Sequence, residues 1–303
     1  MEKEQWAVRV SKKQGEETRQ KLQAEKLLDR TLKIEVQQDD ILIPVLVQLP
    51  ESMKYHFTVI RQQDALQRHE LIGGIAIIQE NDAHGAAQIL ASRPSVHTVL
   101  YATSTVTGRY RTREFLVLAG TDTTRTEYTE YQMNFTIDLA AAYFSARLAN
   151  ERQRIRMAMQ DKEQVLDMFA GVGPFSIALA NRASIIYACD INPAAVLLME
   201  KNIRKNRVRT IIPVLADTMI LPHILKPCFD RIIMNLPLSG SEFLPVAFSL
   251  CRPGGIIHWY VLVSRTGEHL QKIHEMGASF VQERQVRSYS SDRFHTVYDI
   301  TKG

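Results

Sequence analysis

Cysteine is scarce in this sequence, and the few cysteines form no recognisable metal or disulfide pattern. The 303 residues include only Cys189, Cys228 and Cys251, which are widely spaced and make no CxxC pair. This spacing argues against a structural zinc site and against a disulfide framework. We therefore expect no metal centre, and we expect a reducing compartment, the cytoplasm.

Long apolar runs are missing as well. No uncharged stretch reaches the length that spans a bilayer, and no apolar block follows the highly charged start, Met1-Glu2-Lys3-Glu4. We therefore expect neither a signal peptide nor a membrane partner. The net charge of +4 permits a nucleic-acid partner but does not require one.

The chain divides by pattern into three blocks, residues 1–50, 51–150 and 151–303. The first two predict small modules of mixed helix and strand, because short strand-like stretches surround single helices. In the first block we expect a helix at 15–28 and strands at 6–10, 31–36 and 40–47. In the second we expect a helix at 84–92 and strands at 56–60, 96–103 and 126–139. Pro50 and the charged residues 51–56 predict a linker between these modules.

The third block alternates strand-like and helical stretches. Hydrophobicity within its strands is continuous, as in "SIIYACD" and "DRIIMN", which indicates a parallel sheet covered on both faces. The alternation predicts a doubly wound, Rossmann-like α/β domain with a mostly parallel sheet. Residues 279–290 and 294–300 have no helix between them, so they predict an antiparallel pair.

Four predicted strand ends in this block carry residues suited to a ligand, which in such sheets lies beyond the carboxyl ends of the strands. Gly171 and Gly173 allow a tight turn and close backbone approach. Asp190 follows some twenty residues later, where an acidic side chain reaches a ribose diol. Asp217 ends the third strand, and Asn235-Leu236-Pro237 ends the fourth. Each feature alone is often structural, so their alignment is what points to a binding site.

The glycine turn also restricts the kind of ligand. It lacks the third glycine of a dinucleotide fingerprint and the Lys-Ser/Thr of a phosphate loop. This favours a ligand with a nucleoside and no phosphate, such as S-adenosylmethionine.

Taken together, several stretches resemble one enzyme family. "DMFAGVGPFSIALA", "ACDINPAA", "EKNIRKN", "DRIIMNLPLSGSEFL" and "GGIIHWY" resemble the class I methyltransferase domain of the archaeal and eukaryotic tRNA (guanine-37-N1)-methyltransferases. "GEETRQKLQAEKLLD" is similar to the family's N-terminal module, and "RTREFLVLAG" and "IDLAAAYFSARLANER" are similar to its middle block. The resemblance implies a seven-stranded sheet, S-adenosylmethionine as cofactor, and tRNA as partner. The anticodon stem-loop would lie at the active site, and the first module would touch the tRNA body.

The chemistry of such a reaction calls for particular side chains. Methylation of guanine at N1 requires loss of the N1 proton while negative charge builds on O6, so the site needs a base and a cation or donor. Glu151 is a candidate base, since a carboxylate partly withdrawn from water can act near neutral pH. Arg111 is a candidate for the O6 charge, and Asn235 for the edge of the base, with Pro237 stiffening its loop. The resemblance assigns Arg111, Glu151 and Asn235 the same roles.

Further site residues follow from the resemblance. It implies that Phe169, Asp190 and Asp217 hold the cofactor beside Gly171 and Gly173. Asn235 and Pro237 are expected to line both the cofactor and the substrate sites, and Tyr143 and Arg147 the substrate site.

Basic side chains are expected to meet RNA phosphates. Strand alternation would place Arg109, Arg111 and Arg113 on one face, which suits such contacts. The candidates are Lys12, Lys13, Arg109, Arg113, Arg125, Arg147 and Arg154. For any one of them taken alone, a solvated surface charge is the simpler explanation.

Alternatives remain open at the level of sequence. Glu151 lies among Arg147, Arg152 and Arg154, so it could be an ion-pair partner rather than a base. A related enzyme of wybutosine synthesis would transfer the aminocarboxypropyl group of the same cofactor. A non-catalytic tRNA-binding protein and a small-molecule methyltransferase are further possibilities. We expect a monomer.

Overall fold

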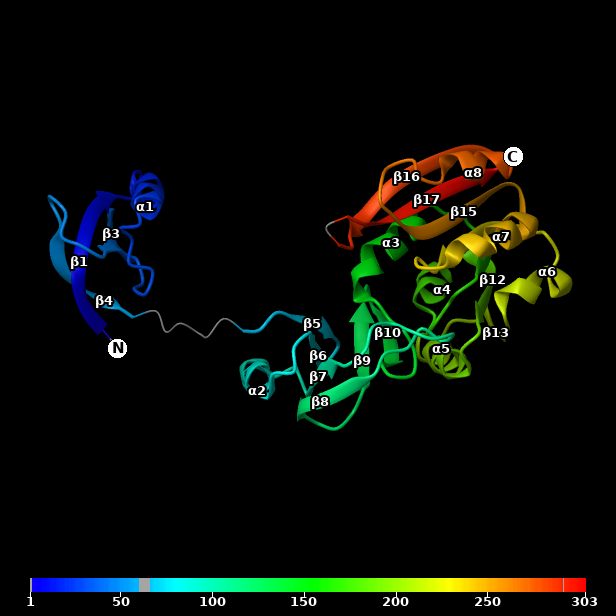
Figure 1. The fold of residues 1–303 in the computed structure, drawn as a ribbon, viewed down its shortest axis with the longest axis horizontal. Coiled ribbons are helices and arrows are strands. Elements are labelled where there is room, and N and C mark those ends of the chain that lie inside the picture. The colour runs from blue at the N-terminus through cyan, green and yellow to red at the C-terminus, as the bar shows by residue number, and fades with distance from the viewer. Residues whose placement is uncertain (1, 60–65, 291) are drawn as a thin grey trace. The chain divides into compact units, whose positions relative to one another are not determined.

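The computed structural model describes residues 2–59, 66–290 and 292–303. Contacts divide the chain into two compact units, Met1–Leu66 and Gln67–Gly303 (Figure 1). None of the described helices is both long and apolar enough to cross a membrane.

The first unit is a four-stranded antiparallel sheet with one helix. Its strands are β1 (Glu2–Ser11), β2 (Glu35–Gln37), β3 (Asp40–Val45) and β4 (Met53–Thr58), in the order β2-β3-β1-β4. Helix α1 (Gly15–Ala24) packs Leu22 against Ile43 and Val45, while Leu42 packs on the opposite side with Phe57. Both faces of the sheet are therefore covered.

Two predictions for this unit were wrong in their limits. The linker expected at 51–56 is occupied by β4, which pairs with β1 along its whole length and buries Phe57 completely. The helix expected at 15–28 ends at Ala24, because Lys26 adopts a left-handed backbone with φ of 58°. The chain can then turn, and the amide groups of Leu27 and Leu28 both bond to the carbonyl of Leu22.

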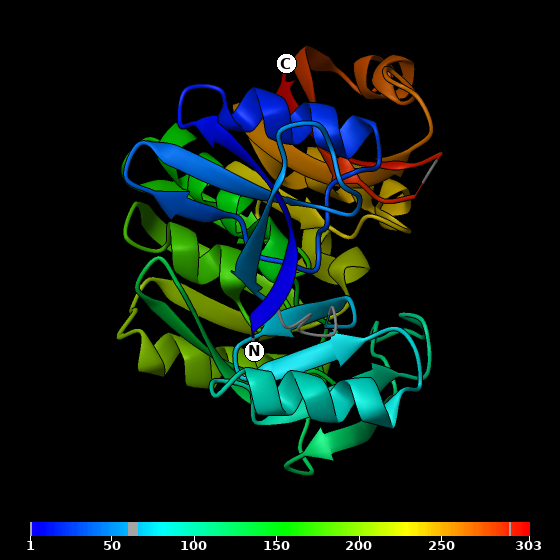
Figure 2. The ribbon, with the colours of Figure 1, turned by 90° about the vertical axis from the view of Figure 1, so that its left-hand side faces the viewer.

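The second unit opens with a four-stranded sheet and a hairpin. The sheet runs β5 (His69–Ile72), β6 (Ile75–Ile78), β7 (Thr98–Ala102) and β8 (Phe115–Gly120), in that order. Helix α2 (Ala83–Ser92), capped by Asp82, packs along one side of it (Figure 2). This helix confirms the prediction at 84–92.

The stretch at 126–139 is a hairpin rather than a single strand. It forms β9 (Arg125–Glu130) and β10 (Met133–Asp138), joined by Tyr131 and Gln132. Both connecting residues have positive φ, 44° and 67°, as the tight turns of hairpins require. Neither is Gly, Asn or Asp, so the sequence carried no turn signal at this point.

The rest of the second unit is a seven-stranded mixed sheet, which confirms the predicted fold class. Its order is β13-β12-β11-β14-β15-β17-β16, and the first five strands are parallel. The strands are β11 (Glu163–Asp167), β12 (Ala183–Asp190), β13 (Ile211–Leu215), β14 (Phe229–Asn235), β15 (Cys251–Val263), β16 (Ala278–Ser288) and β17 (Phe294–Lys302). The helices are α3 (Ala149–Ala158), α4 (Pro174–Leu179), α5 (Pro193–Lys205), α6 (Leu221–Ile224), α7 (Leu244–Leu250) and α8 (Leu270–Glu275). Strands β16 and β17 form the predicted antiparallel pair.

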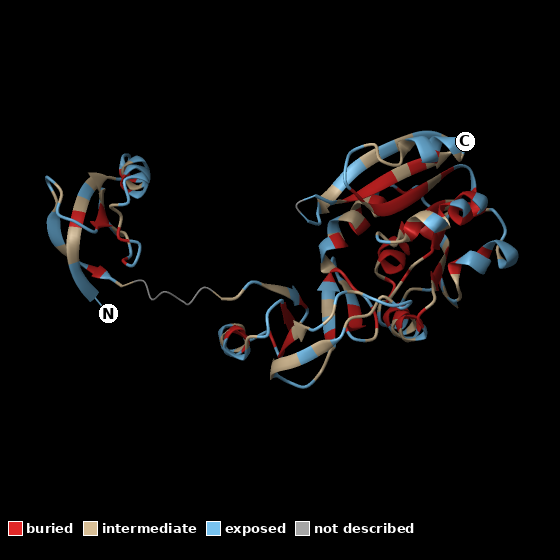
Figure 3. Cartoon of the chain, viewed as in Figure 1, coloured by how far each residue is buried: buried red, intermediate tan, exposed pale blue. Residues whose placement is uncertain are grey.

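Side chains of one strand alternate between two cores, as expected for a sheet covered on both faces. Val165 and Ile233 belong to one cluster, whereas Leu166, Ile232 and Met234 belong to the other. Buried residues accordingly fill the central strands and the helices against them (Figure 3).

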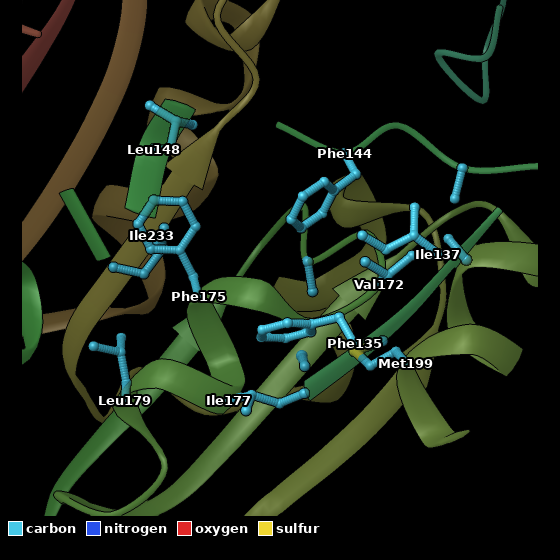
Figure 4. Packing of buried hydrophobic residues seen from close by; sticks show 14 of the residues in the cluster. Phe135, Ile137, Phe144, Leu148, Val172, Phe175, Ile177, Leu179, Met199 and Ile233 are labelled. Atoms are coloured by element: carbon cyan, nitrogen blue, oxygen red, sulfur yellow. The ribbon is translucent and has the colours of Figure 1, made fainter. Parts of the chain in front are cut away.

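The first of these cores also joins the hairpin to the seven-stranded sheet. Phe135 and Ile137 of β10 lie among Phe175 and Ile177 of α4 and Met199 of α5 (Figure 4). This core is continuous across residue 150, so residues 67–303 form one body. The roles assigned to the three modules at 1–50, 51–150 and 151–303 remain a prediction.

Candidate active site

The glycine turn after β11 is tied to the end of β12. The amide of Gly171 donates to Oδ2 of Asp190 at 2.7 Å, and the amide of Asn192 donates to Oδ1 at 2.9 Å. Burial raises the pKa of Asp190, although these backbone donors oppose the shift. An ionised carboxylate accepts about four hydrogen bonds, so Asp190 keeps capacity for a diol.

The space above this turn is open. Gly171 and Gly173 both have positive φ, 58° and 86°, which favours glycine. A Cβ built on Gly171 would find only one neighbouring atom within 4 Å, the carbonyl oxygen of Tyr143 at 3.6 Å. A ligand can therefore approach the backbone of Gly171 closely.

Phe169 follows β11 and Asp217 follows β13, the two strands on either side of β12. The half-buried ring of Phe169 meets Phe243 edge-on, with centroids 5.0 Å apart. Asp217 caps a short 3₁₀ helix, η2 (Thr218–Ile220), by accepting from the amide of Met219 at 3.0 Å. Its other oxygen accepts from Nη2 of Arg109 at 3.1 Å.

Arg109 and Arg111 belong to a turn, which corrects the prediction that they alternate with Arg113 along a strand. The turn is closed by Thr107 and Thr112, and β8 starts only at Phe115. Two residues of this turn, Gly108 and Arg111, have positive φ, 72° and 56°. The turn sends Arg109 toward Asp217, as described above, and Nη2 of Arg111 donates to Oγ of Ser239, four residues after Asn235.

Asn235 and Pro237 form the end of β14 and the loop that follows. The carbonyl of Pro237 accepts from the amide of Leu262 at 3.1 Å, which fixes the loop against β15. The side chain of Asn235 has no hydrogen-bond partner among the described residues, so its amide is available to a substrate.

Glu151 lies in the first turn of α3, with its side chain 12% exposed. Its Oε2 accepts from Nε of Arg154 at 2.9 Å and from the hydroxyl of Tyr260 at 3.0 Å. Tyr260 pairs in register with Asn235 across β14 and β15. The carboxylate is thus an ion-pair partner of Arg154, which was one of the alternatives. It also contacts Tyr260, the residue of β15 that lies beside Asn235 of β14.

Tyr143 and Arg147 lie on the segment before α3. Tyr143 is 45% exposed, and its carbonyl oxygen lies 3.6 Å from the position that a Cβ on Gly171 would take. The carbonyl of Ala141 accepts from Nδ2 of Asn192 at 2.7 Å, which anchors this segment beside Asp190. Arg147 is 53% exposed and pairs with Glu70 at 2.7 Å.

The candidate RNA contacts differ in their surroundings. Arg154 is 18% exposed and bonds both Glu151 and Asp299, so the expectation that it meets phosphates was wrong. Arg125 pairs with Asp138 at 2.8 Å but is 74% exposed, and Lys12 and Lys13 are exposed.

The thiols are not grouped with other ligands. Burial raises the pKa of Cys189 to about 12 and that of Cys251 to about 11, whereas Cys228 is half-buried and unpaired. Across residues 2–59, 66–290 and 292–303, no three His, Cys, Asp or Glu side chains form a metal-binding group.

Ser239 and Tyr260 were missed from the sequence, although both touch predicted site residues. Ser239 stands within "DRIIMNLPLSGSEFL", but nothing in its spacing indicates contact with an arginine more than one hundred residues earlier. Tyr260 lies in an apolar run typical of a core strand, and only the register of β15 reveals its neighbours.

Comparison with known proteins gives this arrangement a family. The TRM5/TYW2 methyltransferase domain matches residues 126–283, and the tRNA methyltransferase 5 N-terminal domain matches residues 7–53. The chain belongs to the TRM5/TYW2 methyltransferase family. The class I methyltransferase fold expected from the sequence is therefore confirmed.

Individual members of the TRM5/TYW2 family match over nearly the whole chain. A tRNA (guanine(37)-N(1))-methyltransferase Trm5b from Pyrococcus abyssi is 35% identical over 97% of this chain and 98% of its own length. The crystal structure of that organism's Trm5b has a TM-score of 0.75 and covers 98% of this chain and 99% of its own. A solved complex of aTrm5 with tRNALeu is 28% identical, with a TM-score of 0.74 over 98% of this chain and 99% of its own.

Other TRM5/TYW2 relatives cover less of it. A tRNA(Phe) (4-demethylwyosine(37)-C(7)) aminocarboxypropyltransferase from Methanocaldococcus jannaschii is 29% identical over 77% of this chain and 96% of its own length. Nearly a quarter of this chain therefore has no counterpart in that alignment, although 96% of the relative is aligned.

Proposed function

We propose that this chain transfers the methyl group of S-adenosylmethionine to N1 of guanosine 37 in tRNA. The single observation that carries the proposal is the convergence of three side chains at one edge of the sheet. Arg111 contacts the loop after β14, Glu151 contacts β15 beside Asn235, and Asn235 itself is unpartnered among the described residues.

The residues at the strand ends fit S-adenosylmethionine. Asp190 has hydrogen-bonding capacity for the ribose diol, and the open surroundings of Gly171 admit the ligand. Phe169 offers an apolar ring face for the adenine, and Asp217 a carboxylate for its amino group. When bound, this cofactor supplies an electrophilic methyl group.

The protein's side chains would prepare the guanine for reaction. Glu151 takes the N1 proton, so that N1 gains a lone pair. Arg111, which stays charged at any working pH, stabilises the negative charge on O6. Asn235 hydrogen-bonds the edge of the base, while the anchored carbonyl of Pro237 keeps this loop in place. Tyr143 is exposed beside the glycine turn, where it can stack on the base.

The proposal also covers how the tRNA is bound. Guanosine 37 lies in the anticodon stem-loop and must be splayed out to reach this site. We assign Arg147 and the exposed basic side chains of the second unit to the stem-loop, and Lys12 and Lys13 to the tRNA body. We also propose that the chain acts as a monomer and, since all three cysteines are free thiols, in a reducing compartment such as the cytoplasm.

Aminocarboxypropyl transfer is the second candidate, since one relative with that name shares the family. Methyl transfer is favoured because the Trm5b relative matches 97% of this chain, against 77% for the aminocarboxypropyltransferase.

The deciding experiment uses a guanine-37 tRNA transcript and cofactor labelled separately in its methyl and carboxypropyl carbons. We expect methyl label alone in the RNA, and mass spectrometry of the nucleosides should show 1-methylguanosine at position 37. A transcript with adenine at position 37 is the control. Carboxypropyl label in the RNA, or equal labelling of the control, would contradict the proposal.

A further inference from the structure

Glu151 is held by one of its two carboxylate oxygens. Nε of Arg154 and the hydroxyl of Tyr260 both donate to Oε2, at 2.9 and 3.0 Å. Among the described residues, Oε1 has no hydrogen-bond partner. The two donors come from different elements, α3 and β15, so the carboxylate is fixed from two directions.

Tyr260 is a rigid and permanent donor. Its side chain is fully buried in β15, and its ring lies 5.6 Å from that of Phe175. Burial, and then the nearby Glu151, raise the pKa of Tyr260 well above 10. The hydroxyl therefore stays protonated throughout the working range of pH and donates a hydrogen bond to Glu151.

Arg154 is held in place from the other side by β17. Its Nη1 and Nη2 lie 2.6 and 3.2 Å from the carboxylate oxygens of Asp299. Burial would lower the pKa of Arg154, but the pairing with Asp299 raises it instead. One guanidinium thus bridges two carboxylates, with its Nε left for Glu151.

Asp299 is in turn oriented by a buried histidine of defined tautomer. Nη1 of Arg231 lies 2.5 Å from Nε2 of His258, and an arginine can only donate, so Nε2 must accept. Burial lowers the pKa of His258, so the ring is neutral and its proton is on Nδ1. Nδ1 then donates to Asp299 at 2.5 Å. Arg231 is itself paired with Glu163 at 2.6 Å.

We propose that Tyr260 and Arg154 are positioning residues that clamp Oε2 of Glu151 and leave Oε1 to receive the N1 proton. This inference rests on the proposed function, since it assigns the supports of the proposed base. The clamp fixes the direction of the free oxygen, because its two donors hold Oε2 from different elements. Neither residue touches the substrate.

The ionisable groups around the clamp come from α3, β15 and β17. They are Arg154, Tyr260, His258, Asp299 and His295, whose ring lies 5.8 Å from that of Tyr260. Burial lowers the pKa of His295 to about 4, so it is neutral near pH 7. Among these groups, only Arg154 and Tyr260 bond Glu151 directly.

The test compares Tyr260→Phe with Tyr298→Phe in the full chain. Both substitutions remove one buried hydroxyl from this sheet, but Tyr298 packs in the other core, away from Glu151. Two kinds of quantity are measured: the single-turnover rate of methyl transfer at saturating tRNA and cofactor, and the affinities for tRNA and for S-adenosylmethionine. A second variant, Arg154→Lys, keeps the charge but lacks the fork that bridges Glu151 and Asp299.

We expect Tyr260→Phe to lower the single-turnover rate about tenfold, because one hydrogen bond that fixes the carboxylate is lost, while both affinities stay within about twofold of the wild type. Arg154→Lys should act in the same direction, and Tyr298→Phe should change neither the rate nor the affinities. An unchanged rate in Tyr260→Phe, or an equal loss of rate in Tyr298→Phe, would overturn the clamp. A wild-type protein that binds both ligands but does not methylate the transcript would instead overturn the proposed function.

Discussion

Glu151 forms an ion pair with Arg154, and we propose it as the general base. Its replacement by Gln keeps the size and removes the ability to take a proton. We expect Glu151→Gln to slow single-turnover methyl transfer about 10²- to 10⁴-fold, with cofactor affinity little changed in isothermal titration. Asp190→Ala serves as the reverse control, because it should weaken cofactor binding. A wild-type rate in Glu151→Gln would rule out this residue as the base.

Asp167 gives the free energy of unfolding a distinctive dependence on pH. It is fully buried below the glycine turn, accepts from Oγ of Ser176 at 2.7 Å, and burial raises its pKa from 3.8 to about 7. Between these values the folded carboxyl keeps its proton while the unfolded one has lost it. The unfolded state then binds fewer protons, so the free energy of unfolding falls as pH rises from 4 to 7.

Asp167→Asn removes this fall. Relative to the wild type, we expect the free energy of unfolding of the variant to rise on the order of 4 kcal/mol between pH 4 and pH 7.5, then level off. Urea denaturation at several pH values measures the difference, in which the contributions of all other groups cancel. A difference that is constant with pH would show that Asp167 is ionised in the folded protein.

The turn at residues 107–112 acts as one element that carries two arginines to two strand ends. Arg109 pairs with Asp217, with the side chains 68% and 38% exposed, while Arg111 contacts Ser239. An exposed pair contributes at most about 1 kcal/mol, so we expect Arg109→Gln to lower the methyl-transfer rate about two- to fivefold at low salt. The loss should disappear near 1 M salt, where the pair is screened.

The matched control for this element is Arg204→Gln, which removes an exposed pair with Glu200 on α5, away from the turn. It should leave the rate unchanged at both salt concentrations. If Arg109→Gln also leaves the low-salt rate unchanged, Arg109 does not help to place Arg111.

Elements differ in how far the sequence could predict them. The strands β11, β12 and β14 were predictable because continuous apolar runs are typical of strands buried on both faces. The turns at Tyr131-Gln132 and at Arg111 were not, because these residue types rarely adopt positive φ and their conformation depends on the surrounding structure. The predicted site residues lie at the expected strand ends, but the contact of Tyr260 with Glu151 depends on a pairing across 109 positions that no local pattern encodes.

At the scale of the whole molecule, all residues proposed for cofactor binding and chemistry belong to the unit Gln67–Gly303. The first unit has its own core around Ala7, Leu42 and Phe57. We therefore expect a chain of residues 67–303 to bind S-adenosylmethionine within about twofold of the full chain in calorimetry. Its affinity for tRNA should be lower, because the phosphate contacts proposed for Lys12 and Lys13 would be lost.

If the shortened chain binds tRNA more weakly, the salt dependence of binding shows whether phosphate contacts were lost or the chain misfolded. The shortened chain should show a smaller slope of log affinity against log salt, by about one for each lost phosphate contact. Equal slopes for the two chains would mean that the first unit does not touch the RNA.

The unequal burial of the three thiols has a practical consequence for spectroscopy. Thiolates react with maleimides. Cys189 and Cys251 are buried, and burial raises the pKa of these thiols to about 12 and about 11, so they resist modification. Cys228 is half-buried, the most exposed of the three, and it immediately precedes the strand that ends in Asn235. The natural chain therefore offers one attachment point for a fluorophore, from which docking of the tRNA can be followed without engineering.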